Sequence, residues 1–311
     1  MRALVADISK YDPDFNPVAF REMGGAAVIV KATMGFGRDA LLDRHASLTI
    51  GSGLALELYH WLDPTSTLQR QVDLLRAAIR QYHPAAVWVD VEQWWGDWDL
   101  WYAARAGRIS MSRVPVVSDR HQFDLAARFI AAIRADFDPE RVGIYTGKWF
   151  IDRYCPSLRG IVGAHPLWLA QYVSGMAGEF DGERLQLARE ILQSGRPALP
   201  VNARTWDMWQ VSDRVKLTGV CSNAVDLNVS RLEEGEYLAW LGGEPVADPK
   251  PGVREVVVTA WLGVRVREQP STAARKLKTL GYAARVRVED APGEWLKLAD
   301  EPGWISAVWV R

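Results

Sequence analysis

The sequence has few of the features that define several large classes of protein. Its 311 residues include only two cysteines, Cys155 and Cys221, which lie far apart and match no metal-binding spacing. No apolar run approaches the roughly 20 residues that a membrane span needs. The net charge of −1 gives no excess of basic residues, which argues against a nucleic-acid-binding protein. We therefore expect no metal ion, no cofactor, no membrane span and no nucleic-acid partner.

The start of the chain shows no signal-peptide pattern. The opening residues, MRALVADIS, form a short apolar run that already contains Asp7, whereas a signal peptide has a longer uninterrupted apolar segment. An extracellular protein of this sequence then needs another exit route, or the chain is a mature form. The two cysteines are expected to be free thiols, with a single disulfide as the open alternative.

Tryptophan is the residue type present in excess, with 15 copies. Four of them, Trp94, Trp95, Trp98 and Trp101, crowd into a polar stretch, which is a poor pattern for a buried core. Aromatic rings exposed in a loop often stack on flat ligands or sugars. A ligand-binding surface and a local aromatic core are therefore equally compatible with this stretch.

Short apolar runs alternate with helical patterns up to about residue 240. Helices are expected at Thr65–His83, Asp119–Asp136 and Gly182–Ser194, where apolar residues recur at spacings of three and four. This alternation predicts a parallel sheet, and about eight strands predict a closed (β/α) TIM-like barrel. The barrel is expected to be irregular because its last strands lack long helices between them. The expected strands are Leu4–Ile8, Ala27–Lys31, Leu54–Trp61, Ala86–Glu92, Val142–Thr146, Pro166–Tyr172, Thr205–Val211 and Ala224–Val229.

The composition changes near residue 242. The segment GGEPVADPKPG, residues 242–252, has Gly- and Pro-rich ends around a polar middle and is typical of a linker. Residues 253–311 contain short alternating strands separated by turn residues, which predict a small all-β barrel. The sequence thus predicts a barrel domain over residues 1–241, a linker, and a second domain over residues 253–311.

Four acidic residues fall at or near the ends of the expected strands. Asp7 lies near the end of the first strand, Asp90 and Glu92 end the fourth, and Asp226 lies in the last. Catalytic groups of a parallel barrel gather at the C-terminal ends of its strands, so we expect these acids to cluster. Because side chains alternate along a strand, Trp88, Asp90 and Glu92 are expected to share one face.

Asp90 and Glu92 lie roughly 6.6 Å apart along a strand backbone. Two carboxyl groups that close share an electric field, so one of them is expected to keep its proton near neutral pH. Glycoside hydrolases typically use such a pair, one carboxylic acid that donates a proton and one ionised carboxylate. The alternative is a structural pair of acids bonded to backbone groups or to arginine.

Eight short segments carry a resemblance to a known family. In order along the chain they are DIS at Asp7, VIVKAT at residues 28–33, YHW at Tyr59, DVE at Asp90, GIYTG at Tyr145, LWLAQY at Trp168, WDMWQ at residues 206–210, and VDLN at Asp226. Over nearly all of residues 1–240 the sequence resembles glycoside hydrolase family 25, the Chalaropsis-type lysozymes. The resemblance implies a barrel enzyme that hydrolyses the β-1,4 bond between N-acetylmuramic acid and N-acetylglucosamine in peptidoglycan.

The resemblance also implies roles for individual residues. Glu92 matches the general acid, and Asp90 matches its partner, which either attacks the sugar or orients the acetamido group of the substrate. Asp7 and Asp226 match the remaining acids of the site. The implied groove residues, to which we add two tryptophans of the loop that follows Glu92, are Tyr59, Tyr145, Trp168, Tyr172, Gln210, Trp94 and Trp95. A role in the barrel core is the alternative for the largest of these side chains.

Three features depart from the family pattern. Met34 stands where many members have an acid, Glu57 adds an acid to the third expected strand, and residues 93–117 form a long connection that holds the tryptophan cluster. Such a loop is expected on the rim of the groove, where it either extends the sugar subsites or caps the groove. Two other functions therefore stay open: a catalytically inactive scaffold that binds wall glycan, and a hydrolase of another N-acetylated glycan such as chitin.

Residues 253–311 resemble a bacterial Src-homology-3-like domain, a module that usually binds cell wall. Segments such as GVRVREQPS and EWLKLADEPGWIS carry this resemblance. The basic residues Arg265, Arg267, Arg275, Lys276 and Lys278 are candidates to bind anionic wall polymers, or they form an ordinary solvated basic face. The combination resembles an endolysin that is made in the cytoplasm and reaches the wall through holin-made lesions.

Overall fold

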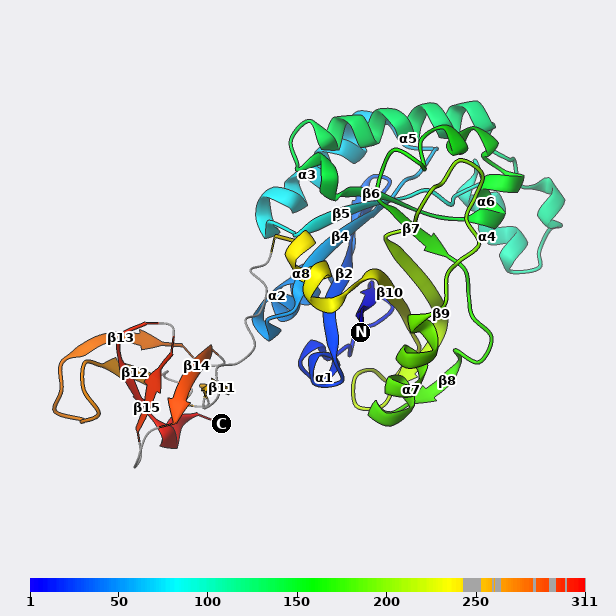
Figure 1. Ribbon diagram of the computed structural model, residues 1–311. Helices are drawn as coiled ribbons and strands as arrows, with labels where there is room; N and C mark the ends of the chain where they lie inside the picture. The colour runs from blue at the N-terminus through cyan, green and yellow to red at the C-terminus, as the bar shows by residue number, and fades with distance from the viewer. Residues whose placement is uncertain are drawn as a thin grey trace. The chain divides into compact units, whose positions relative to one another are not determined.

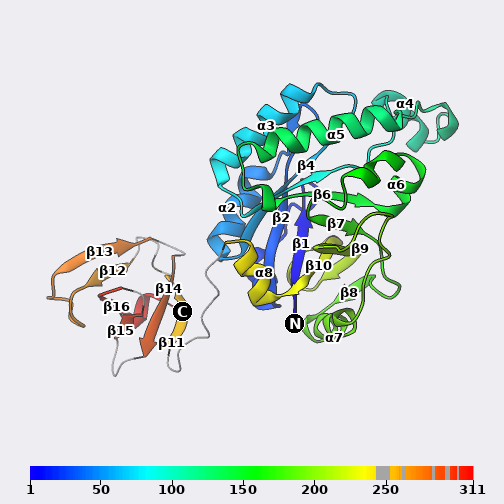
Figure 2. The ribbon, with the colours of Figure 1, turned by 45° about the horizontal axis from the view of Figure 1, so that its top comes forward.

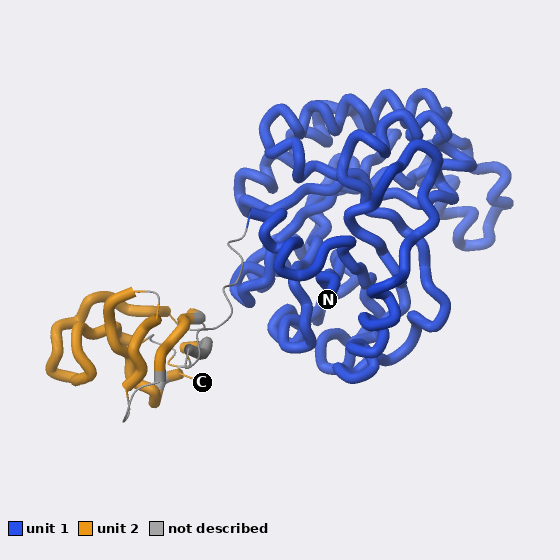
Figure 3. The backbone as a smooth tube through the Cα atoms, in the orientation of Figure 1, with its two compact units in different colours: residues 1–243 blue, residues 244–311 orange. Residues whose placement is uncertain are grey.

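The computed structural model describes residues 1–242, 253–258, 260, 264–281, 284–290, 295–299 and 301–310. The chain divides into two compact units, residues 1–243 and 244–311 (Figure 3). Apart from Gly242, the expected linker at residues 242–252 lies outside the described residues. No helix in the described ranges is both long and apolar enough to cross a membrane.

Eight strands of the first unit close into a barrel, which confirms the predicted architecture (Figure 1). The sheet runs β1-β10-β9-β7-β6-β5-β4-β2 and closes through pairing of β2 with β1. Six of the eight neighbouring pairs are parallel, whereas β10 is antiparallel to both of its neighbours. The bounds are β1 Arg2–Ile8, β2 Gly25–Met34, β4 Ala55–Trp61, β5 Ala86–Asp90, β6 Val142–Gly147, β7 Leu167–Ala170, β9 Met208–Leu217 and β10 Val225–Glu233.

Helices surround this sheet (Figure 2). The three predicted helices are present as α3 (Leu68–Tyr82), α5 (Asp119–Arg134) and α7 (Gly182–Gln193). No helix connects β9 to β10, as the expected irregularity requires. The remaining elements of this unit are α1 (Pro17–Glu22), β3 (Gly37–Arg38), α2 (Leu42–Ser52), α4 (Trp98–Arg105), η1 (Met111–Arg113), η2 (Pro139–Arg141), α6 (Lys148–Arg153), η3 (Pro156–Gly160), β8 (Gly178–Phe180) and α8 (Glu234–Trp240).

The observed strand bounds differ from the predicted ones, and two of these differences bear on the site. The fourth expected strand stops at Asp90, two residues early, and beyond it the hydroxyl of Thr146 donates to the carbonyl of Val91 at 2.8 Å. The seventh begins at Met208 and continues to Leu217. Glu92 therefore lies on the loop that follows β5 rather than within the strand.

The residues of β5 contribute to two separate apolar cores. Val87 and Val89 point outward and pack in the cluster between the sheet and the helices, together with Val91 beyond the strand. Trp88 points inward and packs with Tyr145 inside the barrel. This alternation is the expected strand phase, and it directs the side chain of Asp90 to the barrel interior.

The extra acid of the third expected strand lies buried inside the barrel. Glu57 of β4 is fully buried, and its Oε2 accepts a hydrogen bond of 2.6 Å from Nε1 of Trp88. Its Oε1 accepts a second bond from the hydroxyl of Tyr237 on α8. Burial raises the pKa of Glu57 to about 7, and both hydrogen bonds oppose this shift.

We expect the stability of the protein to fall as pH rises from about 4.5 to about 7 through this one group. The unfolded chain ionises Glu57 near 4.5, whereas the folded chain resists ionisation up to about 7, which corresponds to about 3 kcal/mol of unfolding free energy. Glu57→Gln mimics the neutral acid and removes this term. Urea denaturation at pH 4 and pH 8 should therefore show a smaller loss for the variant than for wild type; equal losses would contradict the assignment.

The second unit is all-β, as expected for residues 253–311. Its six strands form a sheet in the order β11-β14-β15-β16-β12-β13, and all its pairings among the described residues are antiparallel. Val256, Val266, Val288 and Ile305 lie in its buried core. The bounds are β11 Val253–Val257, β12 Val264–Arg267, β13 Lys276–Leu280, β14 Arg285–Asp290, β15 Trp295–Leu298, β16 Trp304–Ser306 and η4 Ala307–Trp309.

Candidate active site

The barrel fold brings the four predicted acids to one end. Asp7 on β1 lies directly opposite Asp226 on β10 in the strand register. Because β10 is antiparallel, Asp226 at its start reaches the same end of the barrel as the C-terminal ends of the parallel strands. Asp90 ends β5 and Glu92 follows it, and the charge of Asp7 acts on both of these acids.

Asp7 and Asp226 are held by amide side chains from neighbouring strands. Nε2 of Gln210 donates to Oδ2 of Asp7 at 3.1 Å and to Oδ2 of Asp226 at 3.3 Å. Nδ2 of Asn228 donates to Oδ2 of Asp7 at 2.8 Å. The hydroxyl of Tyr145 donates to Oε1 of Gln210 at 2.9 Å, which fixes the orientation of that amide. These bonds make the two acids a rigid part of the site.

The two acids of this pair share one proton near neutral pH. Burial raises the pKa of Asp7, but the amides of Asn228 and Gln210 stabilise its charged form and hold the pKa at about 6. Burial and the adjacent charge of Asp7 raise the pKa of Asp226 well above its usual range. The pair therefore carries a single negative charge, with the proton on Asp226 bonded to Asp7.

Asp90 and Glu92 differ from the pair of Asp7 and Asp226, because no described residue donates a hydrogen bond to the carboxyl group of Asp90 or of Glu92. Asp90 is only 3% exposed, and its Oδ1 is buried without a partner. A buried polar atom without a partner is costly, and such atoms cluster at functional sites.

Lys31 supplies a positive charge to this pair of acids. Its Nζ lies 4.7 Å from the ring centroid of Trp61 and 5.5 Å from that of Tyr59. Burial raises the pKa of Glu92 to about 7 and that of Asp90 well above its usual range, and the charge of Lys31 opposes both shifts. Lys31 was not among the residues predicted for the site, although a lysine inside the apolar run VIVKAT was a signal for it.

If Glu92 is the general acid that the family resemblance implies, the rate of glycan hydrolysis should fall as pH rises through about 7, because a general acid works only while it holds its proton. In Lys31→Met this alkaline limb should move to higher pH, since loss of a nearby positive charge makes Glu92 harder to ionise. The measurement is the pH profile of kcat/KM on a soluble glycan. In the matched control Lys10→Met the limb should stay in place, because Lys10 lies over Tyr11 instead. A rate that is flat into alkaline pH would contradict the role of Glu92.

The predicted groove residues occupy different depths. Tyr59, Tyr145 and Gln210 are buried around the acids. Trp168 is 1% exposed and its Nε1 donates to Asn228 at 2.7 Å beneath the site. Of the two readings of Trp168, a groove residue or part of the barrel core, this burial supports the core. Tyr172 is 54% exposed and does offer a ring surface.

A cavity of about 640 Å³ extends from Glu92 and is called here the catalytic cavity. Tyr145, Trp149 and Tyr172 are its aromatic lining residues, and Lys148 and Asp152 line it as well. Trp149 and Tyr172 are both exposed, so rings are available to a ligand here. An acid beside accessible rings is an arrangement suited to holding a sugar next to a proton donor.

The long connection at residues 93–117 is folded. An isolated bridge joins Trp95 to Val116, and α4 begins at Trp98 after the side chain of Asp97 caps it by accepting from the backbone N–H of Leu100 at 2.9 Å. Trp95 is buried and stacks on Trp101 with their ring centroids 4.5 Å apart. The local aromatic core that the sequence allowed is therefore present.

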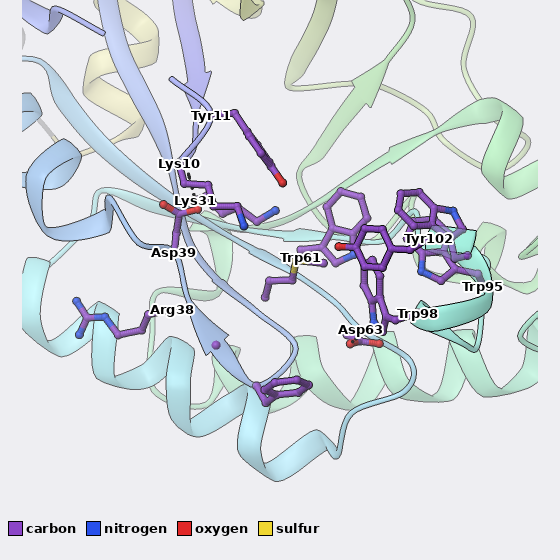
Figure 4. A pocket seen from close by; sticks show the side chains of 14 residues that line it. Lys10, Tyr11, Lys31, Arg38, Asp39, Trp61, Asp63, Trp95, Trp98 and Tyr102 are labelled. Carbon is purple, nitrogen blue, oxygen red and sulfur yellow. Dashed lines mark hydrogen bonds between the residues drawn. The ribbon is translucent and has the colours of Figure 1, made fainter. Parts of the chain in front are cut away.

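The same connection also lines a second cavity of about 600 Å³, called here the aromatic cavity (Figure 4). Trp95 belongs to its lining, but Trp94 does not; the ring of Trp94 stacks on Tyr154 with a centroid distance of 5.1 Å. Met34, one of the departures from the family pattern, also lines it. Its seven aromatic lining residues are Tyr11, Phe36, Trp61, Trp95, Trp98, Trp101 and Tyr102.

One histidine of β4 and both cysteines are buried. The hydroxyl of Thr33 lies 2.7 Å from Nδ1 of His60 and Oε1 of Gln71 lies 3.0 Å from its Nε2, so both ring nitrogens have partners within the fold. Cys155 and Cys221 are both buried free thiols, which resolves the open alternative of a disulfide.

Residues 6–220 match the sequence model of the glycosyl hydrolases family 25. Solved structures with the same fold include the bacterial lysozyme of Streptomyces coelicolor, with a TM-score of 0.57 and 18% identity over 78% of this chain and 97% of that chain. A family GH25 lysozyme from Aspergillus fumigatus has a TM-score of 0.56 and 19% identity, covering 78% and 99%. The catalytic domain of endolysin ply40, from a bacteriophage of Listeria monocytogenes, gives 0.54 and 19%, covering 78% and 98%. No curated protein matches the sequence.

Proposed function

Because the chain belongs to glycosyl hydrolases family 25 and is a glycoside hydrolase, we propose that it cleaves the β-1,4 bond between N-acetylmuramic acid and N-acetylglucosamine in peptidoglycan. The observation that carries the proposal is the pair of acids without hydrogen bonds, Asp90 and Glu92, at the barrel end beside the catalytic cavity. The neighbouring structures include lysozymes, muramidases and an endolysin domain, which supports the same substrate.

Glu92 acts as the general acid in this proposal. Its pKa of about 7 keeps it largely protonated at slightly acidic pH, so it can give its proton to the glycosidic oxygen as the bond to the sugar carbon breaks. Ionised Glu92 then takes a proton from the water that attacks the same carbon, which restores the acid. A pKa near the working pH lets Glu92 donate a proton in the first step and accept one in the second.

Asp90, in the ionised form that the charge of Lys31 favours against burial, stabilises the positive charge that develops on the sugar. It either attacks the anomeric carbon to form a covalent intermediate or orients the substrate acetamido group, which then attacks instead. The buried, unpartnered Oδ1 of Asp90 suits both roles, because each needs an oxygen that no protein group occupies. The rigid pair of Asp7 and Asp226 contributes a fixed negative charge that helps to keep Glu92 protonated.

The second unit is proposed to be a Src-homology-3-like module that binds cell wall, and the whole chain is proposed to act as an endolysin. Some of the predicted basic residues are already neutralised: Arg275 pairs with Glu268 at 3.2 Å and Lys278 pairs with Glu301 at 2.6 Å. Arg267 donates to the carbonyl of Ala274 at 2.6 Å. Arg265 and Lys276 are the exposed cations that best suit an anionic wall polymer.

Turbidity clearing separates the proposed function from its alternatives. Wild type should clear suspensions of purified cell walls and release soluble muropeptides, and it should leave chitin oligomers intact. Cleavage of chitin oligomers without clearing of walls from several bacterial types would establish a different N-acetylated substrate. Binding to walls without release of products would establish the inactive scaffold.

A further inference from the structure

We propose that the aromatic cavity is an additional glycan-binding subsite that holds sugar rings of the same strand at a distance from the hydrolysed bond. The proposal rests on the proposed function, because it takes the glycan strand of peptidoglycan as the ligand. It assigns a purpose to the tryptophan-rich connection at residues 93–117, which the catalytic acids do not require.

The first observation is the distribution of exposed rings. Among the residues that the structure describes, five aromatic side chains are largely exposed, and each of them lines either the aromatic cavity or the catalytic cavity. Tyr11 (70% exposed), Phe36 (62%) and Tyr102 (56%) line the aromatic cavity. Exposed aromatic surface that is gathered at cavities, rather than scattered, marks a binding site.

The second observation is that the cavity wall is preorganised. Nε1 of Trp98 donates to Oδ2 of Asp63 at 3.0 Å, and Nε1 of Trp61 donates to Oε1 of Gln93 at 3.0 Å. Nε2 of Gln93 in turn donates to Oδ1 of Asp63 at 3.0 Å. These bonds fix one ring edge from β4 and one from α4, so a ligand loses little free energy to ordering of the wall.

The third observation is continuity with the acids. Trp61 ends β4 directly beside Asp90 in the strand register, and its ring faces the aromatic cavity. Lys31 lines the same cavity and acts electrostatically on Asp90 and Glu92. A strand bound in the catalytic cavity therefore has a neighbouring aromatic surface on which its next sugars can lie.

The chemistry of the wall favours sugar rings. Trp95, Trp98 and Tyr102 lie together on one side of the cavity and Tyr11 stands apart from them (Figure 4); such rings can stack on the flat apolar faces of pyranoses. The two carboxyl groups of the lining are already satisfied, since Asp39 accepts from the backbone N–H of Lys10 at 3.1 Å and Asp63 accepts from Trp98 and Gln93. Figure 4 shows on one side Lys10, Tyr11 and Lys31 and on the other Trp95, Trp98 and Tyr102.

The test compares peptide-free glycan oligomers of two lengths, a tetrasaccharide and a dodecasaccharide of alternating N-acetylglucosamine and N-acetylmuramic acid. The double variant Phe36→Ala/Tyr102→Ala removes two rings of the cavity that are mostly exposed, and its thermal unfolding midpoint is compared with that of wild type to check the fold. We expect kcat/KM for the long oligomer to fall about 10-fold or more, through KM, with the short oligomer unchanged. Tyr102→Phe keeps the ring and should behave as wild type.

Val116→Ala is the matched control, because Val116 is exposed on the same connection but does not line the cavity. Unchanged kinetics of the double variant on the long oligomer would overturn the subsite while leaving the proposed function in place. A defect confined to substrates that carry stem peptides would also overturn it, because the cavity would then bind peptide. If wild type cleaves neither oligomer, the proposed function itself fails.

Discussion

Replacing Glu92 with Gln should abolish hydrolysis, with a loss of about 10³-fold or more in kcat on purified walls. Gln has the size of Glu but no acidic proton, so this residue can no longer protonate the leaving glycosidic oxygen. Glu92 accepts no hydrogen bond from any described residue, so the substitution removes no described contact that holds the fold. The release of soluble muropeptides over time measures the loss, and binding of intact walls should persist.

Glu57→Gln is the matched control for this experiment. It makes the same substitution at a fully buried carboxyl group of the same barrel, where Trp88 and Tyr237 bond the acid away from both cavities. Glu57→Gln should keep wild-type turnover. Comparable losses in both variants would mean that activity depends on any buried acid of the barrel and not on proton donation by Glu92.

Asp90→Asn should lower kcat by about 10²- to 10³-fold with a smaller change in KM. The substitution keeps the size of the side chain but removes the charge that stabilises the developing cation, whichever of its two roles Asp90 has. Its amide also lacks the nucleophilic oxygen of a carboxylate. Steady-state kinetics on a soluble glycan oligomer measure both constants.

Asp97→Asn is the control for that variant. Asp97 caps α4 on the connection that follows Asp90, and asparagine caps a helix as well as aspartate does. It should leave kcat unchanged. A large rise in KM with unchanged kcat in Asp90→Asn would show that Asp90 serves ground-state binding only and would remove it from the chemistry.

The barrel and the gathering of four acids at one of its ends were predictable from the sequence, because strand period and the positions of acids at strand ends can be read along the chain. The reversal of β10 was not predicted. A parallel last strand would have placed Asp226, at its beginning, at the opposite end of the barrel from Asp7. The pairing of Asp7 with Asp226 therefore depends on the direct β9–β10 connection, which no periodicity reveals.

The depth of each side chain was the least predictable property of the site. Trp168 matched a groove motif, but three aromatic neighbours cover it inside the barrel. Lys31 and Asn228 were missed because their functions arise from contacts with residues far away in sequence. The aromatic cavity was equally hidden, since its wall combines residues from four separate parts of the chain.

The most direct test of the proposed cleavage is the identity of the new reducing end. Purified walls digested with wild type are reduced with borohydride, hydrolysed and analysed for amino-sugar alcohols. Cleavage of the proposed bond leaves N-acetylmuramic acid at the reducing end, so muramitol should accumulate with digestion and be missing after treatment with the Glu92→Gln variant. Accumulation of glucosaminitol instead would show that the other glycosidic bond is cut and would contradict the proposal.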